Sequence, residues 1–351
     1  MDKNNKEQKI THILVIRLSA MGDVAMTVPV ILALRQQHPQ LKITILTRTF
    51  FKPMFSQLSN VTIHEAAVKE KHKGVYGLWK LYKELIALEI DAVADLHNVL
   101  RTNILKKYFG TKEIPFLQID KGRKEKKALT THKSKVFEPL KTTIERYADV
   151  FRKLGFPLEI PKNTHLPKLP LSENAQKIIV PDTKKWIGIA PFAAFKGKMY
   201  PLNKMEEVIK ELNNTEKYKI LLFGGGIVET NQLQQLAATY RSVVTVAGQL
   251  SFEEELSVIS NLDIMLAMDS GNAHLSAMYA IPTVTLWGVT HPYAGFYPYG
   301  QDSDNAIMAN REKFPLIPTS VYGNKFPKGY ENTMETIEPK QIVQKILEIL
   351  N

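Results

Sequence analysis

The sequence of 351 residues contains no cysteine, which excludes disulfide bonds and thiolate metal sites. It has no apolar stretch near the roughly 18 residues that a membrane-spanning helix needs. Residues 1–9 are polar and lack the apolar segment of a secretory signal. A G-x-S-x-G nucleophile elbow and a His/Asp/Glu cluster with metal-ligand spacing are also missing. These absences favour a cytoplasmic protein that uses neither a cysteine nucleophile nor a bound metal.

The chain is strongly basic, with a formal net charge of +11. Such an excess predicts an anionic partner: nucleic acid, a phosphorylated small molecule or an anionic membrane surface. No zinc finger, RNA-recognition motif or basic zipper is present. A phosphorylated small molecule or a membrane is therefore favoured, and nucleic acid is not expected as a partner.

Short β-branched runs alternate with segments of helical period through both halves of the chain. Expected strands are 12–16, 42–47, 91–96, 186–190, 219–225, 243–248, 263–268 and 283–288. Expected helices are 24–38, 76–89, 203–213, 228–240, 252–260 and 272–280. This alternation predicts an α/β protein with two doubly wound, Rossmann-like domains. We expect domains over 1–160 and 161–338 with a proline-rich linker within 154–174, followed by an amphipathic helix over 339–351.

The first candidate site is "RLSAMGDVAMTVPV" (17–30), which leaves the first expected strand and enters a helix. Gly22 permits a tight turn, and Asp23 stands where the helix begins. The helix N-terminus stabilises a carboxylate at this position. Asp23 is therefore either a simple helix cap or a general base that accepts a proton from an attacking hydroxyl.

The second candidate is "MDSGNAHLSAMYAIPTVTLWGVTHP" (268–292). Ser270 and Gly271 lie in a turn at a helix N-terminus, which suits a diphosphate. Asp269 would repel phosphate, so a sugar hydroxyl is its better partner, and His274 is placed to bond the phosphates. The alternative is a capped helix with a buried histidine behind it.

Two further loops follow expected strands. "LLFGGGIVET" (221–230) is neither a P-loop nor a dinucleotide fingerprint, but it lets a nucleotide approach the backbone, with Glu229 near the ribose or base. The alternative is a plain tight turn. In "APFAAFKGKMYP" (190–201), Lys196 or Lys198 is placed to neutralise a diphosphate, unless both are solvated.

The densest basic run is "KGRKEKKALTTHKSK" (121–135). It is interpreted either as a mobile, solvated loop or as a basic mouth for a phosphorylated, membrane-embedded acceptor, with Lys124 and Lys127 as its contacts. Trp79, Tyr82 and Leu85 of the expected helix 76–89 belong either to the core or to a lipid contact. The Asp-Ser-Asp at 302–304 matches the metal-binding D-x-D only in letters and is expected at the surface.

Together, "LSAMGDVAMTVP" and the 268–292 stretch resemble glycosyltransferase family 9, the lipopolysaccharide heptosyltransferases. The positions that match the family's motifs are Gly22, Asp23, Pro29, Asp269, Ser270, Gly271, His274, Leu275, Gly288, Thr290 and Pro292. The chain departs from the family at His97 and Asn98, which replace Gln and Gly, and at His291, where Asp is common. It also departs at Ala193, Ala194 and Phe195, where relatives often carry Thr or Ser near the phosphates.

The resemblance implies a GT-B fold, with two Rossmann-like domains facing each other across a cleft, the first binding acceptor and the second binding nucleotide sugar. It implies inverting transfer of heptose from ADP-heptose to the inner core of lipid A, without a metal ion or other cofactor, at the cytoplasmic face of the inner membrane. By the same resemblance Asp23 is the base. The residues implied for the donor are Lys198, Glu229, Asp269, Ser270, Gly271 and His274, and those expected at the acceptor are Gly22, Lys124, Lys127 and Arg146.

The sequence is also compatible with other activities. They are a family 9-like transferase that uses another nucleotide sugar, a sugar-nucleotide epimerase of the same fold, and a non-catalytic binding protein. An epimerase would convert a nucleotide sugar in the absence of acceptor.

Overall fold

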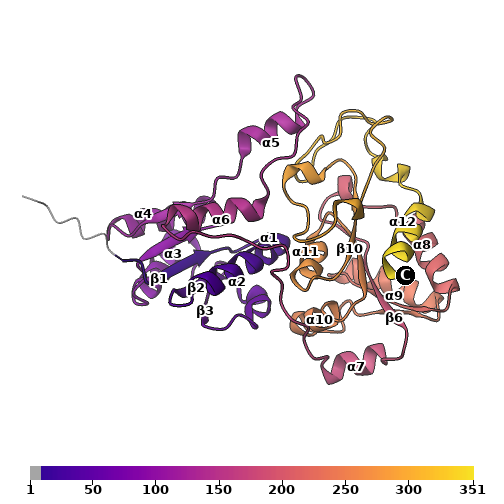
Figure 1. Ribbon diagram of the computed structural model, residues 1–351, viewed down its shortest axis with the longest axis horizontal. Helices are drawn as coiled ribbons and strands as arrows, with labels where there is room; N and C mark the ends of the chain where they lie inside the picture. Colours follow the sequence, from indigo (N-terminus) through magenta and orange to yellow (C-terminus); the bar gives the residue numbers. More distant parts are fainter. Residues whose placement is uncertain (1–8) are drawn as a thin grey trace, which may run out of the picture. The chain divides into compact units, whose positions relative to one another are not determined.

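The computed structural model describes residues 9–351, which form two compact units (Figure 1). The first unit contains residues up to Lys121 together with Ile144–Pro161. The second unit contains Gly122–Thr143 together with Lys162–Asn351. The chain thus enters the second unit, returns for one helix, and leaves the first unit finally after Pro161.

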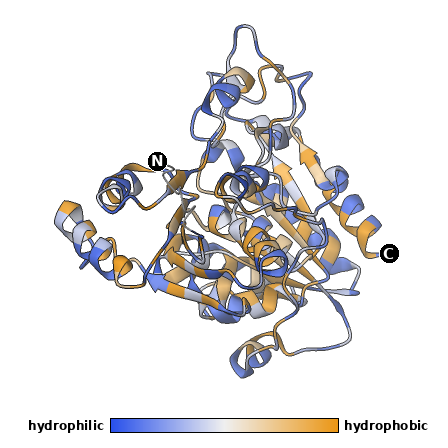
Figure 2. Ribbon diagram, turned by 60° about the vertical axis from the view of Figure 1, so that its left-hand side comes forward, coloured by the Kyte–Doolittle hydropathy of each residue, from blue (hydrophilic) through white to orange (hydrophobic). Residues whose placement is uncertain are grey.

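The first unit is built on a five-stranded parallel sheet with the order β3-β2-β1-β4-β5. Its strands are β1 (His12–Ile16), β2 (Lys42–Thr47), β3 (Val61–Glu65), β4 (Ala92–Asp95) and β5 (Phe116–Gln118). Strands β1 and β4 are buried along their whole length, as expected of apolar strands covered on both faces. Hydrophobic residues predominate in the strands of both units (Figure 2).

Helices connect the strands of the first unit. They are α1 (Met21–Ala25), α2 (Thr27–Gln37), α3 (Gly74–Ile86), α4 (Leu100–Gly110) and α6 (Thr143–Lys153), with a 3-10 helix over Thr49–Phe55. The single helix expected over 24–38 is interrupted at Met26. Pro29 accounts for the break, because its ring lacks an N–H and would clash with the carbonyl of Ala25 in a continuous helix.

The second unit contains a six-stranded parallel sheet with the order β11-β10-β9-β6-β7-β8. Its strands are β6 (Lys185–Ala190), β7 (Tyr218–Leu222), β8 (Val243–Thr245), β9 (Ile264–Met268), β10 (Thr283–Trp287) and β11 (Ala306–Met308). Its helices are α5 (Arg123–Thr130), α7 (Glu173–Ile179), α8 (Leu202–Asn214), α9 (Ile227–Thr239), α10 (Phe252–Ile259), α11 (Gly271–Met278) and α12 (Pro339–Leu350). Its 3-10 helices are Lys196–Lys198, Pro292–Ala294, Ser303–Asn305 and Thr333–Thr336. The C-terminal α12 packs on α8 and buries its apolar face in the core of this unit.

The basic run at 121–135 is not simply a solvated loop, because α5 occupies Arg123–Thr130. Lys126 and Leu129 are buried, and the Lys126 ammonium lies 4.1 Å from the ring centroid of Phe296. The interpretation as a mobile loop is therefore wrong for these residues. Lysine, arginine, alanine and leucine all favour helix, and Gly122, with φ +59°, supplies the turn that precedes it.

The remainder of the 122–143 segment forms hydrogen bonds with other residues of the second unit. Lys135 Nζ donates to the carbonyl oxygens of Leu316 (2.5 Å) and Pro318 (2.6 Å). The backbone N–H of Leu140 donates to the carbonyl of Tyr293 over 2.9 Å. These contacts explain why the segment groups with the second unit although residues of the first unit flank it in sequence.

Each sheet has one point where the strand order reverses. In the first unit it lies between β1 and β4, and in the second it lies between β6 and β9. Ligands of open α/β sheets bind beyond the carboxyl ends of strands at such points. The segments that follow β1, β4, β6 and β9 are therefore the expected ligand-binding segments. None of the helices in the described part of the chain is long and apolar enough to cross a membrane.

Candidate active site

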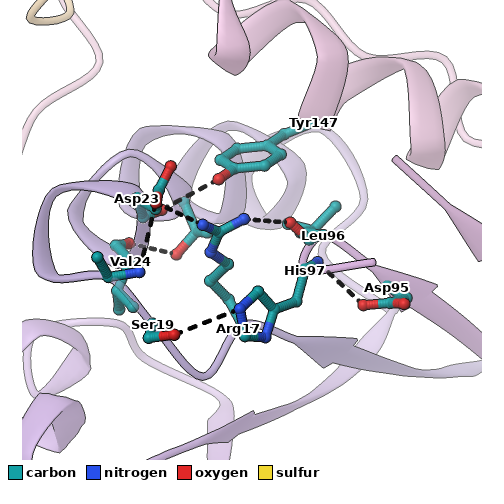
Figure 3. A network of polar contacts seen from close by, with 10 residues as sticks. Arg17, Ser19, Asp23, Val24, Asp95, Leu96, His97 and Tyr147 are labelled. Atoms are coloured by element: carbon teal, nitrogen blue, oxygen red, sulfur yellow. Dashed lines mark hydrogen bonds and ion pairs between the residues drawn. The ribbon is translucent and has the colours of Figure 1, made fainter. Parts of the chain in front are cut away.

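An arginine–aspartate pair lies beyond β1 in the first unit (Figure 3). Arg17 Nη2 is 2.6 Å from Asp23 Oδ2, and the side chains are 8% and 26% exposed. Arg17 Nη1 also donates to the carbonyl of Leu96, just after β4, over 2.6 Å. The short contact to the guanidinium orients the carboxyl group of Asp23. Because a quarter of this side chain is exposed, it remains accessible to a reacting group.

Asp23 is the third residue of α1, whose N-cap is Ala20, so the helix begins two residues earlier than the carboxylate. Its Oδ2 accepts the backbone N–H of Ala20 at 3.3 Å, three residues earlier. Tyr147 of α6 supports the turn, because its hydroxyl donates to the backbone carbonyl of Asp23 over 3.3 Å. Burial raises the pKa of Tyr147 far above its ordinary value, so this phenol stays a neutral donor. The interpretation of Asp23 as a simple N-cap is therefore wrong, because Ala20 holds that position. The carboxylate is paired and partly exposed, and its role as a general base stays a prediction.

A neutral histidine follows β4 in the same unit. Burial, then the positive charges led by Arg17, lower the pKa of His97 from 6.5 to about 3. Its Nε2 lies 3.3 Å from Ser19 Oγ, and its backbone N–H donates to Asp95 Oδ1 over 2.9 Å. His97 Nδ1 is buried and has no hydrogen-bond partner among the described residues. This edge of the first unit therefore combines a carboxylate, a fixed cation and an uncharged imidazole.

The second unit places an ion pair at its own switch point. Lys198 follows β6, Asp269 follows β9, and Lys198 Nζ lies 3.3 Å from Asp269 Oδ2. The side chains are only 15% and 9% exposed. Lys196, the other sequence candidate, is exposed. The geometry thus favours Lys198 as the lysine of the site.

Glycines fix the path of Lys198. An added Cβ on Gly323, whose φ is +78°, would lie 2.3 Å from Lys198 Cγ. Likewise, a Cβ on Gly288 would lie 2.3 Å from the carbonyl oxygen of Gly197, and that oxygen accepts the N–H of Val289 over 2.9 Å. Only glycine permits these approaches. The lysine stem therefore lies against the backbone of Gly323 and is directed at Asp269.

Helix α11 begins at Gly271, two residues after Asp269. Ser270 is its N-cap in extended conformation, but its side chain makes no capping hydrogen bond. The hydroxyls of Ser270 and Thr290 are both buried without a hydrogen-bond partner among the described residues. Because β9 and β10 are neighbours, these hydroxyls follow adjacent strand ends. His274 lies in the same helix and is 7% exposed. Hydroxyl and backbone N–H donors at a helix N-terminus next to a lysine are suited to binding an anionic ligand.

Glu229 closes the glycine-rich turn after β7. Its Oε2 accepts the backbone N–H of Gly225 over 2.9 Å, and it lies in the first turn of α9. Part of its function is therefore to hold the turn. Its expected contact with a nucleoside stays a prediction.

The residues expected at the acceptor are divided between the units. Gly22 and Arg146 belong to the first unit, where Arg146 is 5% exposed and its Nη1 donates to the carbonyl of Asp120 over 3.4 Å. Lys124 and Lys127 belong to α5 of the second unit and are exposed. The domain boundaries drawn from the sequence do not anticipate this placement of α5. The acceptor role of all four residues stays a prediction.

Three residues of these sites escaped the sequence analysis. Arg17 directly precedes the motif, and a basic residue six positions from Asp23 was a usable signal. Tyr147 lies 124 residues from Asp23 along the chain, and Gly323 acts only through its missing side chain. Neither has a local sequence signal.

Among residues 9–351, no group of three or more His, Asp and Glu side chains is placed to hold a metal ion. The Asp-Ser-Asp at 302–304 is an exposed 3-10 turn in which Asp302 Oδ1 accepts the N–H of Asp304 over 3.0 Å. His291 is buried, and burial, then the charges of Arg311 and Lys135, lower its pKa to about 4. A neutral imidazole therefore stands at this position.

Comparison with known proteins places most of the chain in a family. The model of glycosyltransferase family 9 (heptosyltransferase) matches residues 78–321. Lipopolysaccharide heptosyltransferase 2 of Salmonella typhimurium is 25% identical over 369 residues, covering 97% of this chain and 98% of the relative. Lipopolysaccharide core heptosyltransferase OpsX of Haemophilus influenzae is 23% identical over 302 residues, covering 85% and 84%.

Solved structures agree on the fold. A family 9 glycosyltransferase from Veillonella parvula has a TM-score of 0.75 at 18% identity, covering 97% of both chains. The ADP-heptose lipopolysaccharide heptosyltransferase II of E. coli has a TM-score of 0.68 at 19% identity, covering 97% of this chain and 98% of that one. The E. coli heptosyltransferase WaaC solved with ADP has a TM-score of 0.67 at 19% identity, covering 96% and 99%. The expected GT-B class, two parallel-sheet α/β units, is confirmed.

Proposed function

Because the chain belongs to glycosyltransferase family 9, the heptosyltransferases, we propose that it transfers heptose from ADP-heptose to the inner core of lipopolysaccharide or lipooligosaccharide. The relatives carry lipopolysaccharide and lipooligosaccharide heptosyltransferase names, and one similar structure contains ADP. The observation in this chain that carries the proposal is the Lys198–Asp269 pair beside the N-terminus of α11.

The donor fits the chemistry of the second unit. Lys198 and the free N–H groups at Ser270 and Gly271 would bind the diphosphate, with His274 beside them. Asp269 would accept hydrogen bonds from heptose hydroxyls, and Glu229 would face the adenosine. The lysine already neutralises Asp269, so an anionic ligand meets no uncompensated carboxylate at this turn.

The reaction would proceed with inversion and without a metal ion. An acceptor hydroxyl oxygen forms a bond to the anomeric carbon while the bond from that carbon to the ADP oxygen breaks, and ADP leaves with the electron pair. Asp23 accepts the hydroxyl proton. Lys198, His274 and the α11 amides stabilise the charge that grows on ADP, so they contribute more in the transition state than in the ground state.

The phosphorylated acceptor would be held by Gly22, Lys124, Lys127 and Arg146. Its lipid anchor would place the enzyme at the cytoplasmic face of the inner membrane, in peripheral contact with it. The net charge of +11 supports an anionic acceptor and an anionic surface.

The test is a transfer assay with purified protein, ADP-heptose and a core acceptor freed of its fatty acids. We expect ADP release together with a gain of one heptosyl residue by the acceptor in mass spectrometry. The control reactions replace ADP-heptose by ADP-glucose, UDP-glucose or GDP-mannose. Faster transfer from one of these nucleotide sugars would mean that its sugar, and not heptose, is the one the enzyme transfers. Conversion of ADP-heptose without acceptor would identify an epimerase.

A further inference from the structure

Helix α3 of the first unit carries an outward face that is apolar and basic at once. Val75, Tyr76 and Trp79 are 63%, 67% and 42% exposed. Lys80 and Lys83 are also exposed. The five residues Val75, Tyr76, Trp79, Lys80 and Lys83 are called the α3 face below.

The opposite side of the same helix is core. Leu78, Leu81 and Leu85 are at most 2% exposed, and Tyr82 is 8% exposed. The sequence analysis grouped Trp79 with Tyr82 and Leu85, but the structure separates them. Core packing accounts for Tyr82 and Leu85 and leaves Trp79 unexplained.

The aromatic rings of the α3 face are ordered by their neighbours. Tyr76 and Trp79 stack with ring centroids 5.9 Å apart and an interplanar angle of 15°. Lys80 Nζ lies 4.8 Å from the Tyr76 centroid, and Lys83 Nζ lies 5.7 Å from the Trp79 centroid. Within the described chain, no carboxylate forms an ion pair with Lys80 or Lys83. Two cations without acidic partners therefore frame an exposed aromatic pair.

Helix α4 is a neighbour of α3 and carries exposed residues of the same two kinds. It packs against α3 (Figure 1). Tyr108 of α4 donates its hydroxyl to the carbonyl of Val75 over 3.3 Å. Leu100 at the start of α4 is 76% exposed, and Arg101, Lys106 and Lys107 are exposed as well. Both helices of this pair thus carry exposed cations, and each exposes at least one large apolar side chain.

We propose that the α3 face docks the enzyme on an anionic phospholipid bilayer. Tyrosine and tryptophan partition to the headgroup level of membranes, and lysines beside them are attracted by anionic headgroups. Lysine stems also cover apolar surface while the ammonium stays at the interface. The inference rests on the proposed function in one respect, namely that a lipid-anchored acceptor requires the enzyme at a membrane.

The charge of the α3 face favours a bilayer over a second copy of the chain as its binding partner. A two-fold contact through this face would bring the lysines of one copy against those of the other, with no carboxylate on the face to offset them. An anionic bilayer neutralises the same charges. The face therefore fits lipid better than itself.

Trp79 supplies a direct readout. The chain has three tryptophans, and the other two, Trp186 and Trp287, are 7% and 1% exposed. With vesicles of equal parts phosphatidylcholine and phosphatidylglycerol, we expect co-sedimentation and a blue shift of the tryptophan emission. Phosphatidylcholine alone and high salt should abolish both effects. Trp79→Phe should keep the co-sedimentation and lose the shift.

The charge contribution is tested with Lys73→Gln/Lys80→Gln/Lys83→Gln, three exposed lysines of this helix and its N-cap. Each lysine near an anionic surface contributes roughly fivefold in partitioning, so the triple variant should bind about a hundredfold more weakly. The matched control is Lys177→Gln/Lys210→Gln/Lys217→Gln, which removes three exposed lysines of the second unit. Circular dichroism and thermal melting verify that both variants fold.

The outcomes separate this inference from the proposed function. We expect the α3 triple variant to transfer heptose normally to the water-soluble acceptor and to lose transfer to acceptor in anionic vesicles. Equal vesicle binding by both triple variants, an unshifted Trp79 on bound vesicles, or a dimer that Trp79→Ser disrupts would overturn the docking surface. If the unaltered protein failed to transfer heptose to the water-soluble acceptor, that result would instead count against the proposed reaction.

Discussion

At the scale of single residues, Asp23 carries the sharpest expectation. Its carboxylate pairs with Arg17 over 2.6 Å and is 26% exposed. Asp23→Asn keeps the shape and the hydrogen bond to Ala20 but cannot accept a proton. We expect kcat to fall by about two or more orders of magnitude while ADP affinity stays the same, measured by initial rates and calorimetry. Near-normal turnover would limit Asp23 to a structural role in the first turn of α1.

His97 gives a prediction about pH and stability. Its pKa falls from 6.5 to about 3 on folding, so the unfolded chain binds the proton more readily between these values. The free energy of unfolding should therefore drop as the pH falls from about 6.5 towards 3, by an amount on the order of a few kcal/mol from this residue. His97→Gln should flatten that slope in urea titrations at successive pH values.

The control for His97 is His132→Gln, at an exposed position. It should leave the slope unchanged. Some slope will persist in His97→Gln, because burial also lowers the pKa of His291 to about 4. An unchanged slope in His97→Gln would mean that this imidazole is protonated in the folded protein.

The sequence could identify the site residues that follow predicted strands, but not the contacts between distant residues. Asp23, Lys198 and Ser270 lie in the segments that follow β1, β6 and β9, and the carboxyl ends of parallel strands are where ligands bind. The Lys198–Asp269 pair joins residues 71 positions apart and was not predicted as a pair, because its formation depends on β6 and β9 being neighbours in the sheet.

At the scale of elements, the loop around Gly323 positions Lys198. Gly323→Ala would place a methyl group 2.3 Å from Lys198 Cγ and also strain a backbone with φ +78°. We expect ADP affinity to fall several-fold to tenfold, because the ammonium moves away from the diphosphate site. The measurement is ADP titration by calorimetry.

Gly329→Ala provides the matched control. Gly329 has a similar φ of +86°, but an added Cβ there would meet nothing within 4 Å. Both variants carry the backbone strain of about 1 kcal/mol, and only Gly323→Ala displaces the lysine. Equal ADP affinities in the two variants would show that Gly323 serves the turn alone.

The elements themselves were largely predictable. All eight strands expected from short β-branched runs are present in the structure. They could be predicted because fully buried parallel strands are continuously apolar. The edge strands β3, β5 and β11 were missed, and β5 and β11 have only three residues each. Helix α5 was missed because its charge suggested solvation. A charged helix is stable here because Lys126 and Leu129 bury one side of it.

At the scale of the whole molecule, the residues proposed to bind the donor all belong to one unit. Lys198, Glu229 and residues 269–274 lie in the second unit, whereas Asp23 and Arg17 lie in the first. ADP alone should therefore stabilise the second unit without requiring the first. Ligand at a hundred times its Kd adds about 2.7 kcal/mol, which corresponds to roughly 5–10 °C in the melting of a unit of this size.

Hydrogen exchange with and without ADP locates this stabilisation. We expect slower exchange at 196–198, 223–230 and 269–275, the segments that follow β6, β7 and β9, and no change around Asp23. ADP should stabilise more than UDP or GDP if Glu229 faces adenosine. Lys198→Ala should lose most of the effect, since Asp269 would then repel the diphosphate, and Lys198→Ala/Asp269→Asn should recover part of it. Slower exchange confined to the first unit would place the nucleotide there and reverse the assignment of the two units.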